Sequence, residues 1–300
     1  MSAIKWVCML GCLFFVGGWF IGAAAESIPA EQAAPAQAAE KTAPAIVWEN
    51  QYIRYVVEPT GRNQSFLDKK SGQEQLILQR PSWLLSIRKA GRDHVPSQCQ
   101  WADGKLTAQF ADAQAQVVLA VRMQPKYLVF EIQSASDGVE EIRLLNFWLR
   151  CGELSSGISG VARDEQFAVA VRALNLQMMG HTGSQPSTVL AGVSGPKPKG
   201  SAGIWDEKLP ARIAVLSATA SQNHGLAGAK LALVACPTPQ IRQTLQEMLE
   251  KENAVRSRLG GPWALDAPET RGSYVFATVS EANADEWIQL AKTAGLAEIH

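Results

Sequence analysis

The sequence predicts a mainly β protein that is built around one large antiparallel β-sandwich. From Ile46 to Cys236, apolar and polar residues alternate with a period of two, and Gly and Asp turns separate the alternating runs. After Pro237 the apolar residues recur with the period of a helix. From Ser273 a strand-like run, a helical run and a second strand-like run follow one another. We therefore expect a sandwich over residues 46–236, followed by a short α and β segment.

Residues 1–25 have the pattern of a signal peptide. Lys5 precedes an apolar run from Val7 to Gly22, and the small residues Ala23–Ala25 offer a cleavage site before Glu26. The apolar run is also close to the roughly 20 residues that span a bilayer, so an uncleaved membrane anchor is the alternative. We expect an exported protein, which is periplasmic, extracellular or at the cell surface, with no integral membrane domain after the signal is cleaved.

Residues 26–45 predict a disordered linker. They consist mainly of Ala, Pro, Glu and Gln, with almost no large apolar side chain. A segment of this composition cannot bury a core of its own. The sandwich is therefore expected to begin at residue 46.

The strands of the sandwich are expected to be short. Val47–Val57 is rich in aromatic and β-branched residues and predicts the first strand. Asp103-Gly104 predicts a turn and Asp137-Gly138 predicts a hairpin turn. Gly180–Gly203 predicts a long loop because it is rich in Gly, Ser and Pro. The periodic positions of Trp83, Trp148 and Trp287 predict buried indole rings. Further strands are expected around Trp83–Arg88, Leu106–Phe110, Val117–Met123, Leu128–Ile132, Ile142–Trp148, Phe167–Val171, Val189–Val193, Ile213–Ser217 and Leu231–Cys236.

Residues 237–272 predict a linking helix and an extended connector. Thr238 is a candidate N-cap, and Pro239 fits the first helical position. An apolar stripe from Ile241 to Leu259 predicts one amphipathic helix of about 20 residues, which ends at Gly260-Gly261.

Residues 273–300 predict a strand, a helix and the start of a second strand. Thr278 and Glu281 have the spacing of a capping box. A parallel strand pair is normally covered by helices and flanked by further strands. We therefore expect these residues to begin an α/β barrel that continues beyond His300. The alternative is that they pack on the sandwich as an appendage. The expected buried face of the helix comprises Ala284, Trp287, Ile288, Ala291 and Ala294.

Two motifs resemble those of a known family. Glu49-Asn50, Tyr52-Ile53-Arg54 and the run Asp68–Glu74 resemble the first hairpins of galactose-mutarotase-like β-sandwich domains. The segment Ser273–His300 is similar to the entry into the catalytic barrel of glycoside hydrolases that carry such a domain. The matching positions in this segment are Glu281, Asn283, Asp285, Glu286, Ala291, Lys292 and Gly295.

This resemblance implies the N-terminal portion of a secreted carbohydrate-active enzyme, a glycoside hydrolase, that acts on a polysaccharide or glycoconjugate. The sandwich would support the barrel or bind carbohydrate. Barrel enzymes carry their catalytic residues at the C-terminal ends of the barrel strands, so the resemblance places catalysis beyond His300. The alternative function is a non-catalytic glycan-binding or surface structural protein.

Composition and motifs exclude several other functions. Lys plus Arg and Asp plus Glu each number 28, so the chain has no basic excess for a nucleic acid. It contains no H-E-x-x-H, H-x-H or C-x-x-C motif and no phosphate-binding glycine loop, so we expect neither a metal nor a cofactor. Beyond residue 25 the chain keeps Cys99, Cys151 and Cys236, and free buried thiols are the favoured interpretation.

We identify no catalytic carboxylate pair, because none of the many acidic residues stands out by its spacing. Five residues are candidates for ligand contact. Tryptophan rings can stack on sugar rings, and acidic or imidazole groups beside them can form hydrogen bonds to hydroxyls. The candidates are Trp205, Asp206, Glu207, His181 and Trp263.

Overall fold

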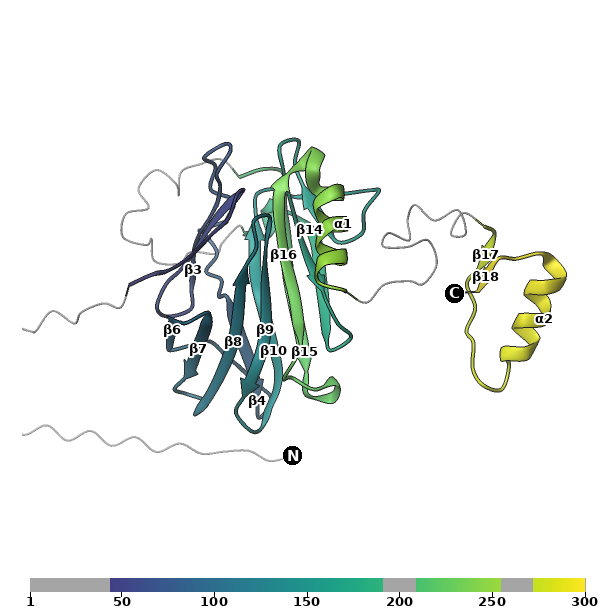
Figure 1. Ribbon diagram of the computed structural model, residues 1–300, viewed down its shortest axis with the longest axis horizontal. Coiled ribbons are helices and arrows are strands. Elements are labelled where there is room, and N and C mark those ends of the chain that lie inside the picture. The colour runs from purple at the N-terminus through teal and green to yellow at the C-terminus, as the bar shows by residue number, and fades with distance from the viewer. Residues whose placement is uncertain (1–43, 191–208, 255–271, 300) are drawn as a thin grey trace, which may run out of the picture. The chain divides into compact units, whose positions relative to one another are not determined.

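The computed structural model describes residues 44–190, 209–254 and 272–299. The predicted signal peptide and nearly all of the linker lie outside these residues. Within them two large antiparallel sheets pack face to face as a β-sandwich, as expected (Figure 1). The eight-stranded sheet has the order β11 (Glu153–Leu154), β12 (Val161–Arg163), β13 (Phe167–Ala173), β16 (Lys230–Pro237), β9 (Tyr127–Ala135), β8 (Ala115–Met123), β7 (Lys105–Phe110) and β6 (Gln98–Ala102).

The second large sheet has five strands. A smaller sheet of three strands is formed by the first three strands of the chain. The five-stranded order is β14 (Met178–Pro186), β15 (Arg212–Ser221), β10 (Val139–Leu149), β4 (Leu85–Lys89) and β5 (Arg92–His94). The three-stranded order is β1 (Ile46–Glu49), β2 (Ile53–Val57) and β3 (Asn63–Asp68).

A cluster of buried aromatic rings joins the three sheets. Tyr55 and Phe66 come from β2 and β3, and both rings contact Phe147 of β10, with centroid distances of 5.2 and 5.0 Å. Trp48 of β1 contacts Phe130 of β9 at 5.6 Å in an edge-to-face geometry. All five side chains are fully buried. Aromatic pairs of this geometry add about 0.5–1.5 kcal/mol each to the free energy of burial.

The first predicted strand is divided in two. The Asn50 Oδ1 atom accepts hydrogen bonds from the backbone N–H groups of Tyr52 and Ile53, at 2.9 and 3.0 Å. An Asx turn of this kind competes with the extended backbone. The segment therefore turns between β1 and β2, and the two strands pair antiparallel.

The two predicted turns at Asp-Gly pairs have different outcomes. Asp103 and Gly104 both have positive φ, as a type I′ turn requires, and they join the paired strands β6 and β7 as expected. Gly138 also has positive φ, but β9 and β10 belong to different sheets. The prediction of a hairpin at Asp137-Gly138 is therefore wrong, because this turn carries the chain from one sheet of the sandwich to the other.

A bulge in β10 reverses which side chains face the core. The register of β10 shifts between Leu144 and Phe147, and Leu145 takes a positive φ of 55°. Phe147 is consequently buried in the main core, and Trp148 is partly buried against a second cluster of Ile77 and Ile213. The Arg80 guanidinium lies 3.7 Å from the Trp148 ring centroid. Trp83 and Trp287 are also only partly buried. The prediction that these three indole rings are core residues is therefore wrong.

The predicted loop Gly180–Gly203 begins as a strand. Residues 180–186 belong to β14, which pairs with β15 along its whole length. A 3₁₀ turn, η1 (Ser187–Leu190), then replaces the start of the strand expected at Val189–Val193, and residues 191–208 lie outside the described residues. The other strands expected after Ala135 form as predicted, and β11 and β12 are additional.

The linking helix is shorter than expected among the described residues. Helix α1 spans Ile241–Lys251 and directly follows the 3₁₀ turn η3 (Thr238–Gln240). A further 3₁₀ turn, η2 (Gln222–His224), lies between β15 and β16. The Thr238 hydroxyl does not cap α1, because it donates to the Asp164 carbonyl at 2.9 Å. The predicted stripe is confirmed at Ile241, Leu245 and Met248, which are buried against the sandwich beside β16. Val255 and Leu259 lie outside the described residues.

The C-terminal segment forms the predicted strand–helix–strand unit. Strands β17 (Tyr274–Val275) and β18 (Glu298–Ile299) pair in parallel, and α2 (Ala284–Ala294) connects them. The predicted capping box does not form, because α2 begins six residues after Thr278, with Asn283 at its N-cap. Gly295 ends the helix in the left-handed conformation.

The expected buried face of α2 is wrong for most of its residues. Ala291 is the one buried residue of α2, whereas Ile288 is 45% exposed. No helix in the described part of the chain is long and apolar enough to cross a membrane.

A nearly buried carboxylate fixes the end of α1 to the sandwich. The Glu252 side chain is 4% exposed and accepts hydrogen bonds from Arg122 of β8 at 2.6 Å and from the Tyr127 hydroxyl of β9 at 3.1 Å. Lys230 of β16 lies 3.7 Å away. Burial alone would raise the pKa of Glu252, but the hydrogen bonds from Arg122 and Tyr127 outweigh it, and the pKa is lowered.

We expect Glu252→Gln to lower the free energy of unfolding by about 1–3 kcal/mol, because the variant leaves two cations without their shared partner. Urea unfolding at neutral pH measures this loss as a lower midpoint at unchanged slope. Glu250→Gln is the matched control, since Glu250 is exposed on the same helix. Equal stability of the two variants would contradict the structural role of Glu252.

The same carboxylate makes stability depend on pH. Because the pKa of Glu252 lies below its ordinary value of 4.5 in the folded chain, its contribution is complete above that value and is lost as the pH falls through the folded pKa. The difference in unfolding free energy between the wild type and Glu252→Gln should therefore shrink between about pH 6 and about pH 3. A constant or growing difference on acidification would show that the carboxylate charge does not stabilise the fold.

Candidate functional site

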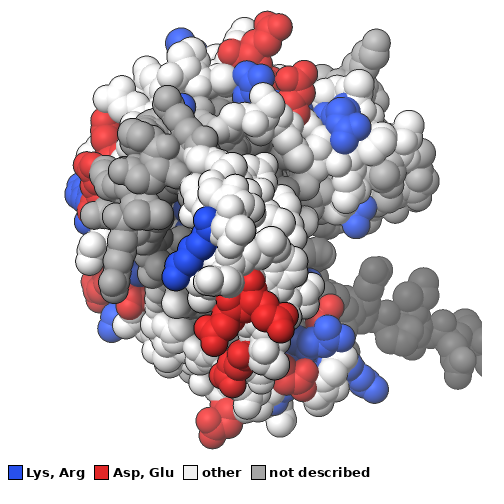
Figure 2. Space-filling view, turned by 90° about the vertical axis from the view of Figure 1, so that its right-hand side faces the viewer, with Lys and Arg blue, Asp and Glu red and all other residues white. Residues whose placement is uncertain are grey.

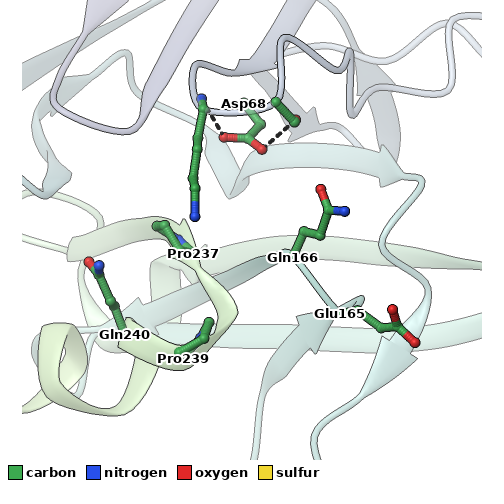
Figure 3. Close-up of a pocket in the computed structure, with 8 residues that line it drawn as sticks. Asp68, Glu165, Gln166, Pro237, Pro239 and Gln240 are labelled. Carbon is green, nitrogen blue, oxygen red and sulfur yellow. Dashed lines mark hydrogen bonds between the residues drawn. The ribbon is translucent and has the colours of Figure 1, made fainter.

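Three turns that are far apart in the sequence enclose a polar pocket of about 470 Å³. One turn follows β3, the second joins β12 to β13, and the third leads from β16 into η3 (Figure 3). We call this hollow the Asp68 pocket. Its lining residues are Asp68, Lys70, Ser71, Glu165, Gln166, Pro237, Pro239 and Gln240.

Asp68 organises the turn on one side of the pocket. Its side chain is nearly buried, and its two carboxylate oxygens accept hydrogen bonds from the Lys70 backbone N–H at 3.0 Å and from the Ser71 hydroxyl at 2.5 Å. Gly72 follows with a positive φ of 72°. Both carboxylate oxygens are therefore used by the turn itself.

A second acidic residue organises the opposite side. The Asp164 Oδ1 atom accepts hydrogen bonds from the backbone N–H groups of Gln166 and Phe167, both at 2.7 Å. The Gln166 carbonyl accepts a hydrogen bond from the Thr238 N–H at 2.9 Å, which joins this turn to the start of η3. Glu165 and Gln166 are thereby held at the pocket rim with exposed side chains.

The pocket can bind a polar ligand but does not have the arrangement of a glycosidase. Glycoside hydrolysis needs two carboxyl groups, one on each side of the scissile bond, and each must be available to the substrate. Glu165 offers an exposed carboxylate across the pocket from Asp68 (Figure 3), but both Asp68 oxygens already accept hydrogen bonds from the turn after β3. Lys70 and Gln166 add a cation and an amide, and Gln240 adds its NH₂ group, because its Oε1 atom accepts a hydrogen bond from the Tyr52 hydroxyl.

The cysteine thiols are poor candidates for nucleophiles. Cys99, Cys151 and Cys236 are free and buried. Burial raises the pKa of Cys99 to about 12 and the pKa of Cys236 to about 11, and it also raises the pKa of Cys151. A thiol acts as a nucleophile in its thiolate form, which these pKa values disfavour.

The predicted contact residues are not assembled by the described part of the chain. His181 lies on β14 rather than in a loop, with its side chain exposed. Its Nε2 atom is 3.3 Å from the position that a Cβ atom would take at Gly183. Trp205, Asp206, Glu207 and Trp263 lie outside the described residues. These five residues stay predictions.

No sequence motif predicted that the residues of the Asp68 pocket would form a site. Lys70, Ser71, Gln166 and Gln240 are ordinary turn and surface residues, and their three segments are separated by about 100 and 70 positions. Only the run Asp68–Glu74, which carried the family resemblance, marked one side of the pocket in advance.

On one face of the molecule the basic side chains are dispersed among other residues. On the face drawn in Figure 2, Lys and Arg side chains are spread among acidic and uncharged residues rather than gathered in one patch. A nucleic acid requires a concentration of cations that face its phosphates. Among the described residues, no group of three or more His, Cys, Asp or Glu side chains is placed to hold a metal ion.

No family model and no curated protein matches the chain. Distant likenesses to solved structures exist. An α-N-acetylgalactosaminidase from Bifidobacterium bifidum is 10% identical over 83% of this chain, with a TM-score of 0.42. A bacterial glucoamylase is 8% identical over 71%, with a TM-score of 0.36. A protein described as an aldose 1-epimerase from Escherichia coli K12 is 9% identical over 64%, with a TM-score of 0.25.

The chain spans 50% of the length of the first of these structures and 36% of the second. The likenesses are too distant to carry an argument about function. The description of the fold as a β-sandwich therefore rests on the strand order and the buried core of this chain.

We expect Asp68→Ala to lower the free energy of unfolding by about 1–3 kcal/mol, because the Lys70 N–H and the Ser71 hydroxyl lose their acceptors. Glu165→Ala is the matched control, since it removes an exposed carboxylate of the same pocket and should leave stability unchanged within about 0.5 kcal/mol. Urea unfolding of both variants measures the two effects. A loss of stability in Glu165→Ala that equals the loss in Asp68→Ala would show that the two carboxylates do not have the separate roles assigned here.

Proposed function

We propose that this chain is the N-terminal portion of a secreted carbohydrate-active enzyme, a glycoside hydrolase. In this proposal the β-sandwich supports the catalytic domain and binds carbohydrate. The catalytic residues belong to barrel strands that follow His300. The substrate is a polysaccharide or a glycoconjugate, and the signal-like residues 1–25 direct export.

The observation that carries this proposal is the strand–helix–strand unit of residues 273–299. Its two strands are parallel, and parallel strands are normally covered by helices and joined to further strands. Helix α2 leaves Ile288 45% exposed and Leu290 50% exposed, and Val279 before it is 48% exposed. Apolar side chains at this exposure fit a unit that is packed between similar units, as in an α/β barrel.

The Asp68 pocket is consistent with a supporting role for the sandwich. It offers amides, a lysine and one exposed carboxylate, which suit binding of a polar ligand. Its second carboxylate is engaged in the turn after β3. The motif resemblance in residues 46–74 and 273–300 also supports this role, because both motifs resemble those of glycoside hydrolases with this domain order.

A non-catalytic glycan-binding or surface structural protein is the second candidate. The engaged carboxylate of Asp68 favours it, since a pocket with one available carboxylate can bind a sugar without cleaving it. The two candidate functions make different predictions for the sequence that follows the strand–helix–strand unit. The enzyme needs further strands with catalytic acids, whereas the binding protein does not.

We expect the coding frame beyond the His300 codon to encode further alternating strands and helices. The longer chain should hydrolyse a chromogenic glycoside, whereas residues 1–300 alone should not, because the catalytic acids are then missing. Release of nitrophenol from a panel of nitrophenyl glycosides measures this. A stop codon directly after His300, or a longer chain without glycosidase activity, would contradict the enzyme and favour the binding protein.

A further inference from the structure

Three glutamines form a row across the outer face of the eight-stranded sheet. Gln98 of β6 lies opposite Gln109 of β7, and Gln109 lies opposite Gln116 of β8. Their strand neighbours Cys99, Ala108 and Val117 are buried in the core. Because side chains alternate between the two faces of a strand, the three glutamines all point outwards. The row spans two interstrand spacings, about 10 Å.

This row lies in a shallow hollow of about 520 Å³ that has no charged lining residue. The tight turn between β7 and β8 forms one wall of the hollow. In this turn Gln114 takes a left-handed conformation with φ of 47°. The residues that line it are Ser97, Gln98, Gln109, Phe110, Ala111, Gln114, Ala115, Gln116 and Ser136.

The hydroxyls and the amides of this hollow differ in their availability. The Ser97 hydroxyl donates to the Gln109 carbonyl at 3.0 Å, and the Ser136 hydroxyl accepts from the Gln116 N–H at 2.9 Å. The side-chain amides of Gln98, Gln109, Gln114 and Gln116 have no hydrogen-bond partner among the described residues and are exposed. Four amides, each with a donor and an acceptor, are therefore available to a ligand.

We infer that this glutamine row binds an uncharged polyhydroxyl ligand, namely a neutral glycan chain. A sugar hydroxyl both donates and accepts a hydrogen bond, which matches an amide that offers both. A phosphate, sulfate or carboxylate would find no cation among the lining residues and would gain no charge-assisted hydrogen bond. The row has the extended form that a chain of sugars needs, rather than the form of a closed pocket.

The inference rests on the proposed function and deepens it. It states where on the sandwich the carbohydrate binds and that this carbohydrate is uncharged. The site is separate from the Asp68 pocket, which is lined by Lys70 and Glu165. Phe110 lines the hollow but is 1% exposed, so its ring cannot stack on a sugar. Binding therefore depends on the amides, and removal of one amide should have a measurable effect.

The test is affinity electrophoresis of the full chain in gels that contain dextran, galactomannan, xyloglucan or the anionic polygalacturonate. At least one neutral polysaccharide should retard the wild type, and polygalacturonate should not. Gln109→Ala removes the central amide and should raise the dissociation constant for the retarding polysaccharide about tenfold. Gln109→Glu should weaken it as well, because a carboxylate accepts but does not donate.

Gln64→Ala is the matched control, since Gln64 is an exposed strand glutamine on β3, outside the hollow. This variant should be retarded like the wild type. The inference is overturned if no neutral polysaccharide retards the wild type, if polygalacturonate alone does so, or if Gln109→Ala is retarded like Gln64→Ala. Since electrophoresis measures binding and nitrophenol release measures hydrolysis, this failure is distinct from a failure of the proposed enzyme.

Discussion

The contact between aromatic rings of three sheets is the constraint on which the arrangement of this molecule depends. Tyr55 and Phe66 of the small sheet lie on Phe147 of β10, and Trp48 lies on Phe130 of β9. The rings therefore fix the small sheet against both large sheets. The turn after β3 is carried into position by this packing, and it forms one wall of the Asp68 pocket. The polar site is thus a consequence of an apolar cluster formed by side chains distant in sequence.

The sequence predicted the class of the fold because burial on one face of a strand imposes a period of two. It did not predict events in which the backbone departs from this period. Leu145 adopts a left-handed conformation in the bulge of β10, so Phe147 rather than Trp148 enters the core. Asn50 similarly ends β1, since its side chain satisfies two backbone N–H groups. Both events depend on tertiary packing or on local hydrogen bonds that compete with the regular pattern.

The sites were harder to predict than the strands for a related reason. The Asp68 pocket joins three turns, and only their tertiary arrangement brings Lys70, Glu165 and Gln240 together. The glutamine row depends on strand register, because a shift by one residue would turn Gln109 from the surface to the core. The five predicted contact residues were chosen by residue type and by an expected position in loops and irregular segments. His181 is on a strand rather than in a loop, and the others lie outside the described residues.

Three carboxylates of the sandwich differ from the amides of the glutamine row in the hydrogen-bonding capacity that they leave for a ligand. Glu252 holds α1 against β8, β9 and β16, Asp68 organises the turn after β3, and Asp164 organises the turn before β13. Protonation of such a carboxylate would weaken the hydrogen bonds that it accepts from the fold, so these three groups are poor proton donors to a substrate. The amides of the glutamine row have no such commitment. In the proposed function, the sandwich would therefore hold a neutral chain, and the catalytic acids would lie in a separate domain.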